Sequence, residues 1–386
     1  MGKNLPIPAT DVEGITRWAE KEKPGLVVVG PEAPLCAGLA DRLRQLGIRV
    51  FGPGAKGAQL EGSKSFCKDL LVRQGIPTAR AGSFSSTREA LVFLETLSCP
   101  VVVKADGLAA GKGVVIAESH GEAKQAMAEM MEGRVFGDAG AKVVLEEFLV
   151  GEELSLHAVT DGKNLVLLPS AQDHKRVGEG DTGLNTGGMG AYSPAPRATP
   201  ELLREVETRI LRPTLAGLAA LGIEYRGVLY AGLMLTADGP MVLEYNCRFG
   251  DPETEVLLPL LDSPVWDLLV AAAEGNLGKA GVRTRAGAAM TVVMAAQGYP
   301  ARPVLGQRIE FGVEVPDTAI FHAGTREGNG GAEVSGGRVL AVTGWGDDLR
   351  IARDRAYGAV GTIDFQGKHF RRDIGHRALG KDTFPK

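Results

Sequence analysis

The 386-residue sequence contains little that would place the protein in a membrane, in an oxidising compartment or on a nucleic acid. Its apolar runs, such as 26–29 and 101–103, have the length of strands and fall far short of the roughly 20 residues of a membrane span. It has four cysteines and no C-x-x-C pair, so we expect reduced, buried thiols and no structural zinc. A net charge of −4 without a basic run gives nucleic-acid binding no support. We therefore expect a cytoplasmic protein that binds neither a membrane nor a nucleic acid.

Glycine, in contrast, is abundant. The chain has 53 glycines, about twice the usual share of ~7%, and six of them lie between 178 and 190. No G-X-Y repeat is present, and 44% hydrophobic residues with 23% charged residues exclude a disordered chain. Because glycine permits positive φ and close approach of the backbone, the excess predicts loops that lie beside ligands.

The first 62 residues predict a Rossmann-like unit. Thr10 followed by Glu13 forms a capping box that begins a helix, and buried strands are expected at 26–29 and 48–51 with a helix between them. This alternation indicates a parallel sheet, whose ligands bind at the carboxyl ends of the strands. Residues 30–34 follow the first of these strands and are therefore candidates for a substrate site.

The rest of the chain predicts two further domains. Ser63 begins a helix, a hairpin with a glycine-rich tip follows at 100–117, and Thr199 begins a long helix. The polar stretch 171–196 predicts a functional loop without regular structure. The expected architecture is α/β and α+β multidomain: a truncated Rossmann-like domain at 1–62, a core domain at 63–275 with a small subdomain at about 82–150, here called the lid, and a strand-rich C-terminal domain at 285–386.

Lys104 ends a predicted strand and precedes a loop with three glycines, Gly107, Gly111 and Gly113. Backbone N–H groups in such a loop can surround an anion, and lysine supplies a point charge for phosphate oxygens. The segment is not a Walker loop, because Lys112 is followed by glycine and by a strand rather than by a helix. We favour phosphate binding over the alternative of a solvent-exposed hairpin.

Glu244, Asn246 and Arg248 share one face of a predicted strand, because alternate residues of an extended chain point to the same side. The oxygens of Glu244 and Asn246 suit Mg²⁺, and a guanidinium suits a phosphoryl group in transfer. Tyr245 and Cys247 are expected to face the other way and pack. The alternative is an edge strand carrying a salt bridge.

Two other polar stretches follow predicted strands. Residues 146–153 could pair with an adenine edge and accept ribose hydroxyls, although an acidic turn is the simpler interpretation. In the long loop, Asp173, Lys175 and Arg176 could hold an amino acid or a phosphate, and the alternative is a mobile surface loop. His174 alone is weak evidence for acid–base catalysis, and we assign it no role.

Taken together, these segments resemble the ATP-grasp superfamily and, within it, the glycinamide ribonucleotide synthetase family. The resemblance covers nearly the whole chain, in order. It is carried by GPEAPL at 30–35, QLEGSK at 59–64, VKADGLAAGKGVV at 103–115, EEFLVGEE at 146–153, QDHKRVG at 172–178, NTGGMGAYSP at 185–194, EYNCRFGDPET at 244–254 and FHAGT at 321–325.

The resemblance implies an enzyme that joins glycine to 5-phosphoribosylamine through a glycyl phosphate, with ATP and Mg²⁺ or Mn²⁺. It implies catalytic roles for Arg248 and Lys104 and metal ligation by Glu244 and Asn246. The implied ATP site comprises Lys64, Lys104, Gly107, Gly111, Lys112, Gly113, Glu146, Glu147, Phe148, Leu149 and Glu153. The implied substrate site comprises Gly30, Pro31, Glu32, Asp173, Lys175, Thr186, Gly187, Gly188, Met189 and Gly190.

The sequence departs from the family pattern at its start. The family opens with a strand and a glycine-rich loop that holds the substrate phosphate, and nothing of that kind precedes Gly30. We expect that one strand–helix unit is missing through a misassigned or truncated start. Two alternative functions therefore stay open: a nucleotide-binding protein without catalysis, and an ATP-grasp ligase with another acceptor.

Overall fold

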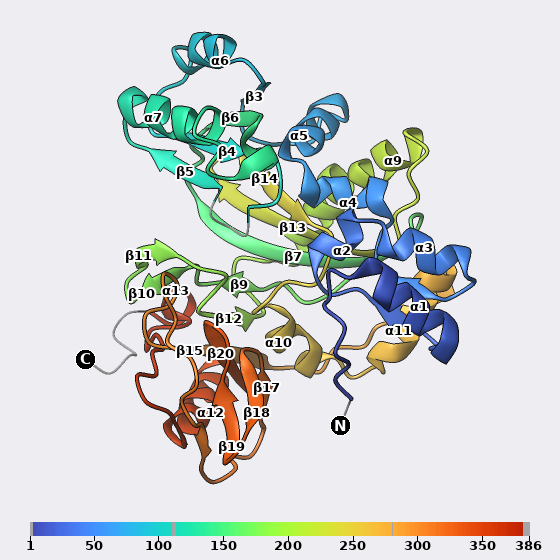
Figure 1. Ribbon diagram of the computed structural model, residues 1–386, viewed down its shortest axis with the longest axis vertical. Coiled ribbons are helices and arrows are strands. Elements are labelled where there is room, and N and C mark those ends of the chain that lie inside the picture. Colours follow the sequence, from blue (N-terminus) through green and yellow to red (C-terminus); the bar gives the residue numbers. More distant parts are fainter. Residues whose placement is uncertain (1–2, 110–112, 280, 381–386) are drawn as a thin grey trace.

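The computed structural model describes residues 3–109, 113–279 and 281–380, and Figure 1 shows their arrangement. The N-terminal part contains α1 (Val12–Glu22), β1 (Val27–Val28), α2 (Glu32–Cys36), α3 (Leu39–Gln45), β2 (Val50–Phe51) and α4 (Ala55–Gly62). As predicted, β1 and β2 pair in parallel. The expected strand 26–29 is shorter than predicted, and Val28 is 46% exposed rather than buried.

Helix boundaries in this part follow local capping with one correction. The N-cap of α1 is Asp11, whose carboxylate accepts a hydrogen bond from the amide of Gly14, and not Thr10. The predicted single helix after the first strand is two helices, α2 and α3, which are separated at Gly38, where φ is +84°. Glycine adopts this left-handed conformation without steric cost, so the chain turns here.

The lid lies at one end of the molecule (Figure 1) and contains a four-stranded antiparallel sheet with the order β3-β6-β4-β5. Ser63 caps α5 (Lys64–Arg73), which leads into the lid, as the sequence predicts. Helices α6 and α7 pack their apolar faces on the sheet and form a separate core with it. The lid elements are β3 (Ala81–Phe84), α6 (Thr87–Leu94), β4 (Val101–Ala105), β5 (Val114–Ala117), α7 (His120–Met131) and β6 (Val143–Glu147).

A second four-stranded sheet, with the order β14-β13-β7-β8, forms the centre of the molecule. Its core includes residues from the N-terminal part, which explains why the blue helices of Figure 1 lie against it. The predicted helix from Thr199 is present, with a π-helical segment at Glu207–Leu211. The elements are β7 (Glu152–Thr160), β8 (Leu165–Leu167), α8 (Pro200–Val206), α9 (Arg212–Ala220), β13 (Gly227–Thr236), β14 (Gly239–Asn246), α10 (Thr254–Leu257) and α11 (Val265–Glu274).

The C-terminal domain contains a five-stranded sheet with the order β17-β20-β15-β12-β9 and has a core of its own. Asp348 caps its long helix, and its carboxylate accepts hydrogen bonds from the amides of Arg350 and Ile351. The elements after residue 285 are β15 (Ala288–Ala295), β16 (Glu310–Phe311), β17 (Thr318–His322), β18 (Thr325–Gly328), β19 (Gly331–Val334), β20 (Arg338–Gly346), α12 (Leu349–Gly361), β21 (Ile363–Asp364) and α13 (His376–Leu379).

The stretch 171–196 is not the irregular loop that the sequence predicts. It contains β9 (Gln172–Asp173), β10 (Arg176–Gly178), β11 (Thr182–Asn185) and β12 (Gly190–Ser193). Strands β10 and β11 form a hairpin, whereas β9 and β12 belong to the C-terminal sheet, with Ala191 opposite Thr291. One of the two strands that pair with β12 is β15, which lies about a hundred residues further along the sequence, so no local pattern indicates this pairing.

Two further sequence predictions concern the cysteines and the lack of membrane-spanning segments. All four cysteines are free, as expected, but Cys99 is exposed and only Cys67 and Cys247 are buried. Within the described ranges, no helix combines the length and the apolar character needed to cross a membrane.

Candidate active site

Lys104, on β4, extends from the lid toward the central sheet. Its ammonium lies 3.0 Å from Oε2 of Glu146 on β6 and donates a hydrogen bond to the carbonyl of Leu243 on β14 at 3.3 Å. Lys68 of α5 approaches the same carboxylate oxygen at 3.3 Å. Burial lowers the pKa of Lys68, and the Glu146 charge opposes this. Two buried ammonium groups thus share one carboxylate where lid and central sheet meet, and positive charge is available there.

The glycine-rich loop begins next to α5. Lys64 donates from its ammonium to the carbonyl of Gly107 at 3.2 Å, and burial lowers the pKa of Lys64. A Cβ on Gly107 would lie 2.7 Å from Cβ of Ala139, so the close approach requires glycine. Lys64, Gly107 and Lys104 therefore lie in one region, as predicted, while Gly111 and Lys112 lie outside the described residues.

The strand β14 alternates as the sequence predicts. Tyr245 and Cys247 are buried in the core, whereas Glu244 is exposed and Asn246 half-buried. Within the described ranges, no cluster of three or more His, Cys, Asp or Glu side chains could hold a metal ion. Two oxygen donors on one face nevertheless fit Mg²⁺, which keeps several water ligands and takes others from substrate phosphates.

Arg248 is held between two carboxylates. One guanidinium nitrogen lies 3.2 Å from Glu61, and another lies 3.4 Å from Glu32 of the 30–34 segment. Burial alone would lower the pKa of Arg248, but both carboxylates outweigh it and raise that pKa. Glu61 also accepts a hydrogen bond of 2.8 Å from the amide of Cys247. Sequence analysis missed Glu61, although it stands within the quoted QLEGSK motif.

Glu153 and Lys175, predicted for different ligands, lie together. The Lys175 ammonium is 2.6 Å from the Glu153 carboxylate, and it lowers the pKa of Glu153. Burial, followed by the charge of Glu253, raises the pKa of nearby Asp173. Oδ1 of Asp173 is buried and makes no hydrogen bond within the described part of the chain. This oxygen is thus unpaired among the described residues and shielded from solvent.

Residues 186–189 form the loop that precedes β12. Thr186 donates to the carbonyl of Lys175 from its amide at 2.7 Å and from its hydroxyl at 2.9 Å. Arg338 donates to the carbonyl of Gly187 at 2.8 Å. Met189 is fully buried in the core of the C-terminal domain, so its side chain has a packing role. Gly190 begins β12.

The remaining predicted residues lie at segment ends. Gly30 and Pro31 are exposed before α2, and Glu32 contacts Arg248 as described. The carboxylate of Glu147 accepts a hydrogen bond of 2.7 Å from the amide of Arg80, and Phe148 is 37% exposed beside Leu149.

A buried polar cluster next to Arg248 was also missed. Glu253 accepts hydrogen bonds from the hydroxyls of Tyr230 and Ser155, and the His157 ring stacks on Tyr230 with centroids 4.2 Å apart. Burial lowers the pKa of His157 to about 4, so the ring is neutral near pH 7. The GDPE sequence at 250–253 is the signal that could have identified this cluster.

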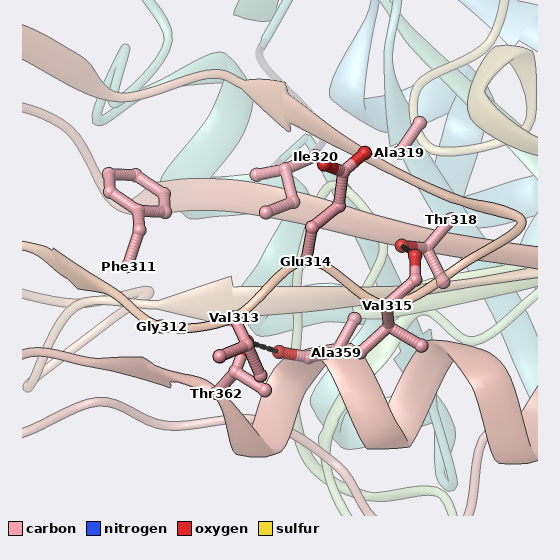
Figure 2. Close-up of a pocket in the computed structure, with 10 residues that line it drawn as sticks. All are labelled: Phe311, Gly312, Val313, Glu314, Val315, Thr318, Ala319, Ile320, Ala359 and Thr362. Carbon is pink, nitrogen blue, oxygen red and sulfur yellow. Dashed lines mark hydrogen bonds between the residues drawn. The ribbon is translucent and has the colours of Figure 1, made fainter.

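Figure 2 shows a hollow on the C-terminal domain, between β17, α12 and residues 311–315. Its lining is mainly apolar and includes Phe311, Val313 and Ile320. None of the predicted site residues lines it. The chemistry-bearing groups therefore gather elsewhere, between the lid, the central sheet and residues 172–190.

Comparisons with known proteins identify the family. Models of the N, ATP-grasp (A) and C domains of phosphoribosylglycinamide synthetase match residues 1–61, 62–254 and 289–377. The phosphoribosylamine–glycine ligase of Chlorobaculum tepidum is 51% identical over 381 residues, which cover 98% of this chain and 90% of that protein. The ligase of the same name from Caulobacter vibrioides is 52% identical over 97% of this chain and 88% of that protein.

Solved structures give the same result. The crystal structure of phosphoribosylamine–glycine ligase from Thermotoga maritima has a TM-score of 0.79 and 40% identity, and covers 84% of this chain and 81% of that chain. A biotin carboxylase domain from Hydrogenobacter thermophilus has a TM-score of 0.74 at 19% identity, over 96% of this chain and 81% of its own, which shows a shared fold. The resemblance predicted from the motifs is thus confirmed, and the chain belongs to the phosphoribosylglycinamide synthetase family with its ATP-grasp fold.

Proposed function

We propose that this chain joins glycine to 5-phosphoribosylamine with ATP, giving glycinamide ribonucleotide, ADP and phosphate in purine biosynthesis. Relatives that are about half identical over nearly the whole chain have the name of this activity. A cytoplasmic location and a monomeric state are part of the proposal, and the four free cysteines accord with a reducing compartment.

The observation that carries the proposal on the chain itself is that Lys104 of the lid donates at 3.3 Å to the carbonyl of Leu243, the residue directly before Glu244 on β14. Burial lowers the pKa of Lys64, and the carboxylate of Glu244 is the strongest charge that opposes it. Burial also acts on Lys175, where Glu153 and then Glu244 outweigh it and raise the pKa. Lys64 belongs to the proposed ATP site and Lys175 to the proposed acceptor site. Glu244 thus acts on both, as expected of a ligand to a metal between ATP and the substrates.

The proposed chemistry needs positioning and charge neutralisation rather than a protein nucleophile. A carboxylate oxygen of glycine attacks the γ-phosphorus of ATP, the bond to the β,γ-bridging oxygen breaks, and ADP leaves. The amine nitrogen of phosphoribosylamine then attacks the carbonyl carbon of the acyl phosphate. The amide bond forms, the nitrogen loses a proton, and the C–O bond to phosphate breaks.

In this scheme Lys64 and Lys104 neutralise ATP phosphates, and Arg248 stabilises the phosphoryl group during transfer. Glu244 and Asn246 would hold Mg²⁺ or Mn²⁺, which supplies further neutralisation of phosphate charge when bound. Asp173 and Lys175, with Glu32 and the backbone of 186–190, would orient glycine and the ribosylamine. Water must be excluded from the site during the reaction, because it would otherwise hydrolyse the acyl phosphate.

The proposal is tested with glycine labelled with ¹⁸O in its carboxylate. We expect release of ADP that requires both glycine and phosphoribosylamine, and transfer of one labelled oxygen into inorganic phosphate. Binding of ATP without ADP release would instead support the non-catalytic alternative. ADP release with another amino acid but not with glycine would support a ligase with a different substrate.

A further inference from the structure

Residues 371–377, here called the C-terminal arm, contact the segment 173–176 at successive positions. Arg377 donates to the carbonyl of Asp173 at 2.9 Å. The amide of Gly375 donates to Nε2 of His174 at 3.2 Å. Arg371 donates to the carbonyl of Arg176 at 3.1 Å. The arm thus fixes the backbone of a segment that carries two proposed substrate residues, Asp173 and Lys175.

Asp181, in the turn between β10 and β11, connects the hairpin to the same arm. Its carboxylate accepts hydrogen bonds from Arg377 at 2.8 Å and from Arg371 at 2.9 Å, and Nε2 of His376 lies 3.4 Å away. Asp181 has φ of +58°, a conformation that is uncommon for a residue other than glycine. The ion pairs with Arg371 and Arg377 compensate for this local strain and keep the turn in place.

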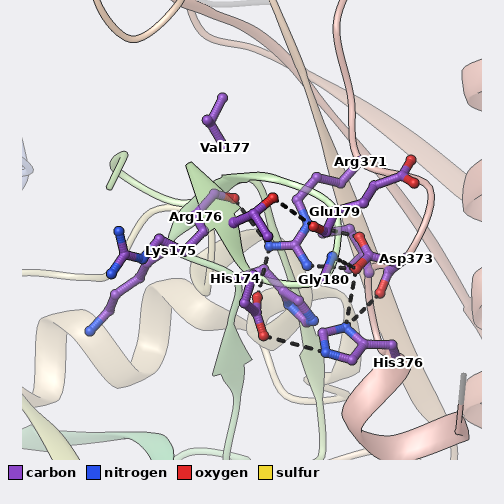
Figure 3. Close-up of polar contacts among 12 residues, drawn as sticks. His174, Lys175, Arg176, Val177, Glu179, Gly180, Arg371, Asp373 and His376 are labelled. Atoms are coloured by element: carbon purple, nitrogen blue, oxygen red, sulfur yellow. Dashed lines mark hydrogen bonds and ion pairs between the residues drawn. The ribbon is translucent and has the colours of Figure 1, made fainter. Parts of the chain in front are cut away.

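Asp373 is the second carboxylate, after Asp181, that binds the guanidinium of Arg371. Arg371 is fully buried and donates two hydrogen bonds of 2.8 Å to the Asp373 carboxylate. A buried guanidinium is stable only when its donors are paired, so Arg371, Asp181 and Asp373 form one rigid unit. Figure 3 shows Arg371 with Asp373 and His376 on one side of the segment.

The side chain of Lys175 points away from the C-terminal arm. In Figure 3 its side chain points away from Arg371 and His376. Its ammonium lies 2.6 Å from the carboxylate of Glu153, at the start of strand β7 in the central sheet. Successive side chains of an extended segment point to opposite sides, so the contact of His174 with the arm directs Lys175 toward the central sheet.

We propose that Arg377 is a positioning residue for the ligase reaction, because its single guanidinium joins the Asp173 carbonyl to the Asp181 carboxylate and thereby orients Asp173 and Lys175. This inference rests on the proposed function. It assigns to the C-terminal domain a part in binding glycine and phosphoribosylamine.

The test compares Arg377→Ala, Arg377→Lys and Asp181→Asn with Arg372→Ala, which removes an exposed arginine from the same arm. Asparagine tolerates positive φ, so Asp181→Asn removes the charge without new backbone strain. For Arg377→Ala we expect KM for glycine or phosphoribosylamine to rise about 10- to 100-fold, the scale of a lost charged hydrogen bond. KM for ATP should rise as well, but less, because Lys175 contacts the proposed ATP site through Glu153. Arg377→Lys, which offers a single ammonium, should retain part of the activity.

Hydrogen exchange of the amides in 172–186 provides a readout that does not depend on catalysis. We expect faster exchange in Arg377→Ala and Asp181→Asn than in Arg372→Ala. Equal exchange in all variants, or a rise in KM for ATP as large as that for the acceptors, would overturn the inference. An inactive wild-type chain would refute the proposed function, while the exchange comparison would still test the contact made by Arg377. If Arg377→Ala does not fold, Arg377→Lys and Asp181→Asn carry the same comparison.

Discussion

The ammonium of Lys104 lies 3.0 Å from Oε2 of Glu146, and less than a tenth of either side chain is exposed. Lys68 approaches the same oxygen at 3.3 Å. The carboxylate therefore balances two buried positive charges from two elements, β4 and α5, and ties the lid to the helix that precedes it. Charge pairs hidden from water are stable only as complete sets, because removing one partner leaves the others uncompensated.

Glu146→Gln should therefore destabilise the protein strongly. We expect a loss of about 3–5 kcal/mol in the free energy of unfolding, since two ammonium groups would remain buried beside a neutral amide. Denaturant unfolding measures the change. Glu147→Gln, one position further along β6, is the control, because its half-buried carboxylate accepts from the Arg80 amide and an amide oxygen can do the same. Equal losses in the two variants would contradict the shared-charge interpretation.

Glu244→Gln should reduce turnover far more than stability. The side chain is exposed, so we expect little change in the unfolding midpoint, whereas ADP release should fall about 10²–10³-fold if the carboxylate holds the metal. Chelation of divalent metal should abolish ADP release in the wild type, and the variant should need more Mg²⁺ for half-maximal rate. Glu327→Gln, an exposed change on β18, serves as the control. A loss of thermal stability that parallels the loss of turnover would favour a salt-bridge role.

Gly188→Ala should disturb the position of Asp173. A Cβ at Gly188 would lie 2.4 Å from Cδ of Pro252 and 2.8 Å from Oδ1 of Asp173, and φ is +113°. We expect a rise in the KM of the acceptor substrates and a loss of about 1–3 kcal/mol in stability, from overpacking and backbone strain. Gly180→Ala shares the positive φ, but its Cβ would meet nothing within 4 Å. If both variants behave alike, backbone strain rather than contact with Asp173 is the cause.

Glu255 should make stability depend on pH. Burial, followed by the nearby charge of Asp251, raises the pKa of Glu255 to about 7. Below about pH 4.3, the pKa of a glutamate in the unfolded chain, the folded and unfolded states both bind the proton. Glu255 then does not change the free energy of unfolding. Between that value and pH 7 the unfolded state binds fewer protons than the folded state, so stability falls as pH rises.

Glu255→Gln tests the direction of this pH dependence of stability. The variant should gain stability relative to the wild type as pH rises from about 4.5 to 7, reaching roughly 3 kcal/mol, and the difference should then level off. Unfolding midpoints of both proteins across this range measure it. A difference that stays constant with pH would show that Glu255 has the same pKa in both states.

Local sequence signals predicted the elements whose cause is local. Ser63 and Thr199 cap their helices as expected, because a cap acts on amides within three residues. The alternation of Glu244 and Asn246 with Tyr245 and Cys247 follows from strand geometry alone. The domain boundaries and the roles of the individual site residues stay predictions.

The failures have non-local causes. The strands β9 and β12 exist because they pair within the C-terminal sheet, and neither has a periodic apolar pattern of its own. Val28 was expected to be buried, yet the parallel pair β1–β2 leaves it 46% exposed. Glu61 and Glu253 stood inside quoted motifs, but only the fold brings them to Arg248 and to Tyr230.

The sequence by itself determined the family, the ATP-grasp fold and the residue types available for phosphate and metal, since these depend on motif order and on short-range periodicity. The tertiary structure decided which charges neutralise one another: Glu146 with two lysines, Arg248 with Glu32 and Glu61, and Lys175 with Glu153. It also decided that the C-terminal arm holds residues 173–176. Electrostatic and hydrogen-bonding partners depend on distances of a few ångströms, and residues far apart in the chain reach such distances only after folding.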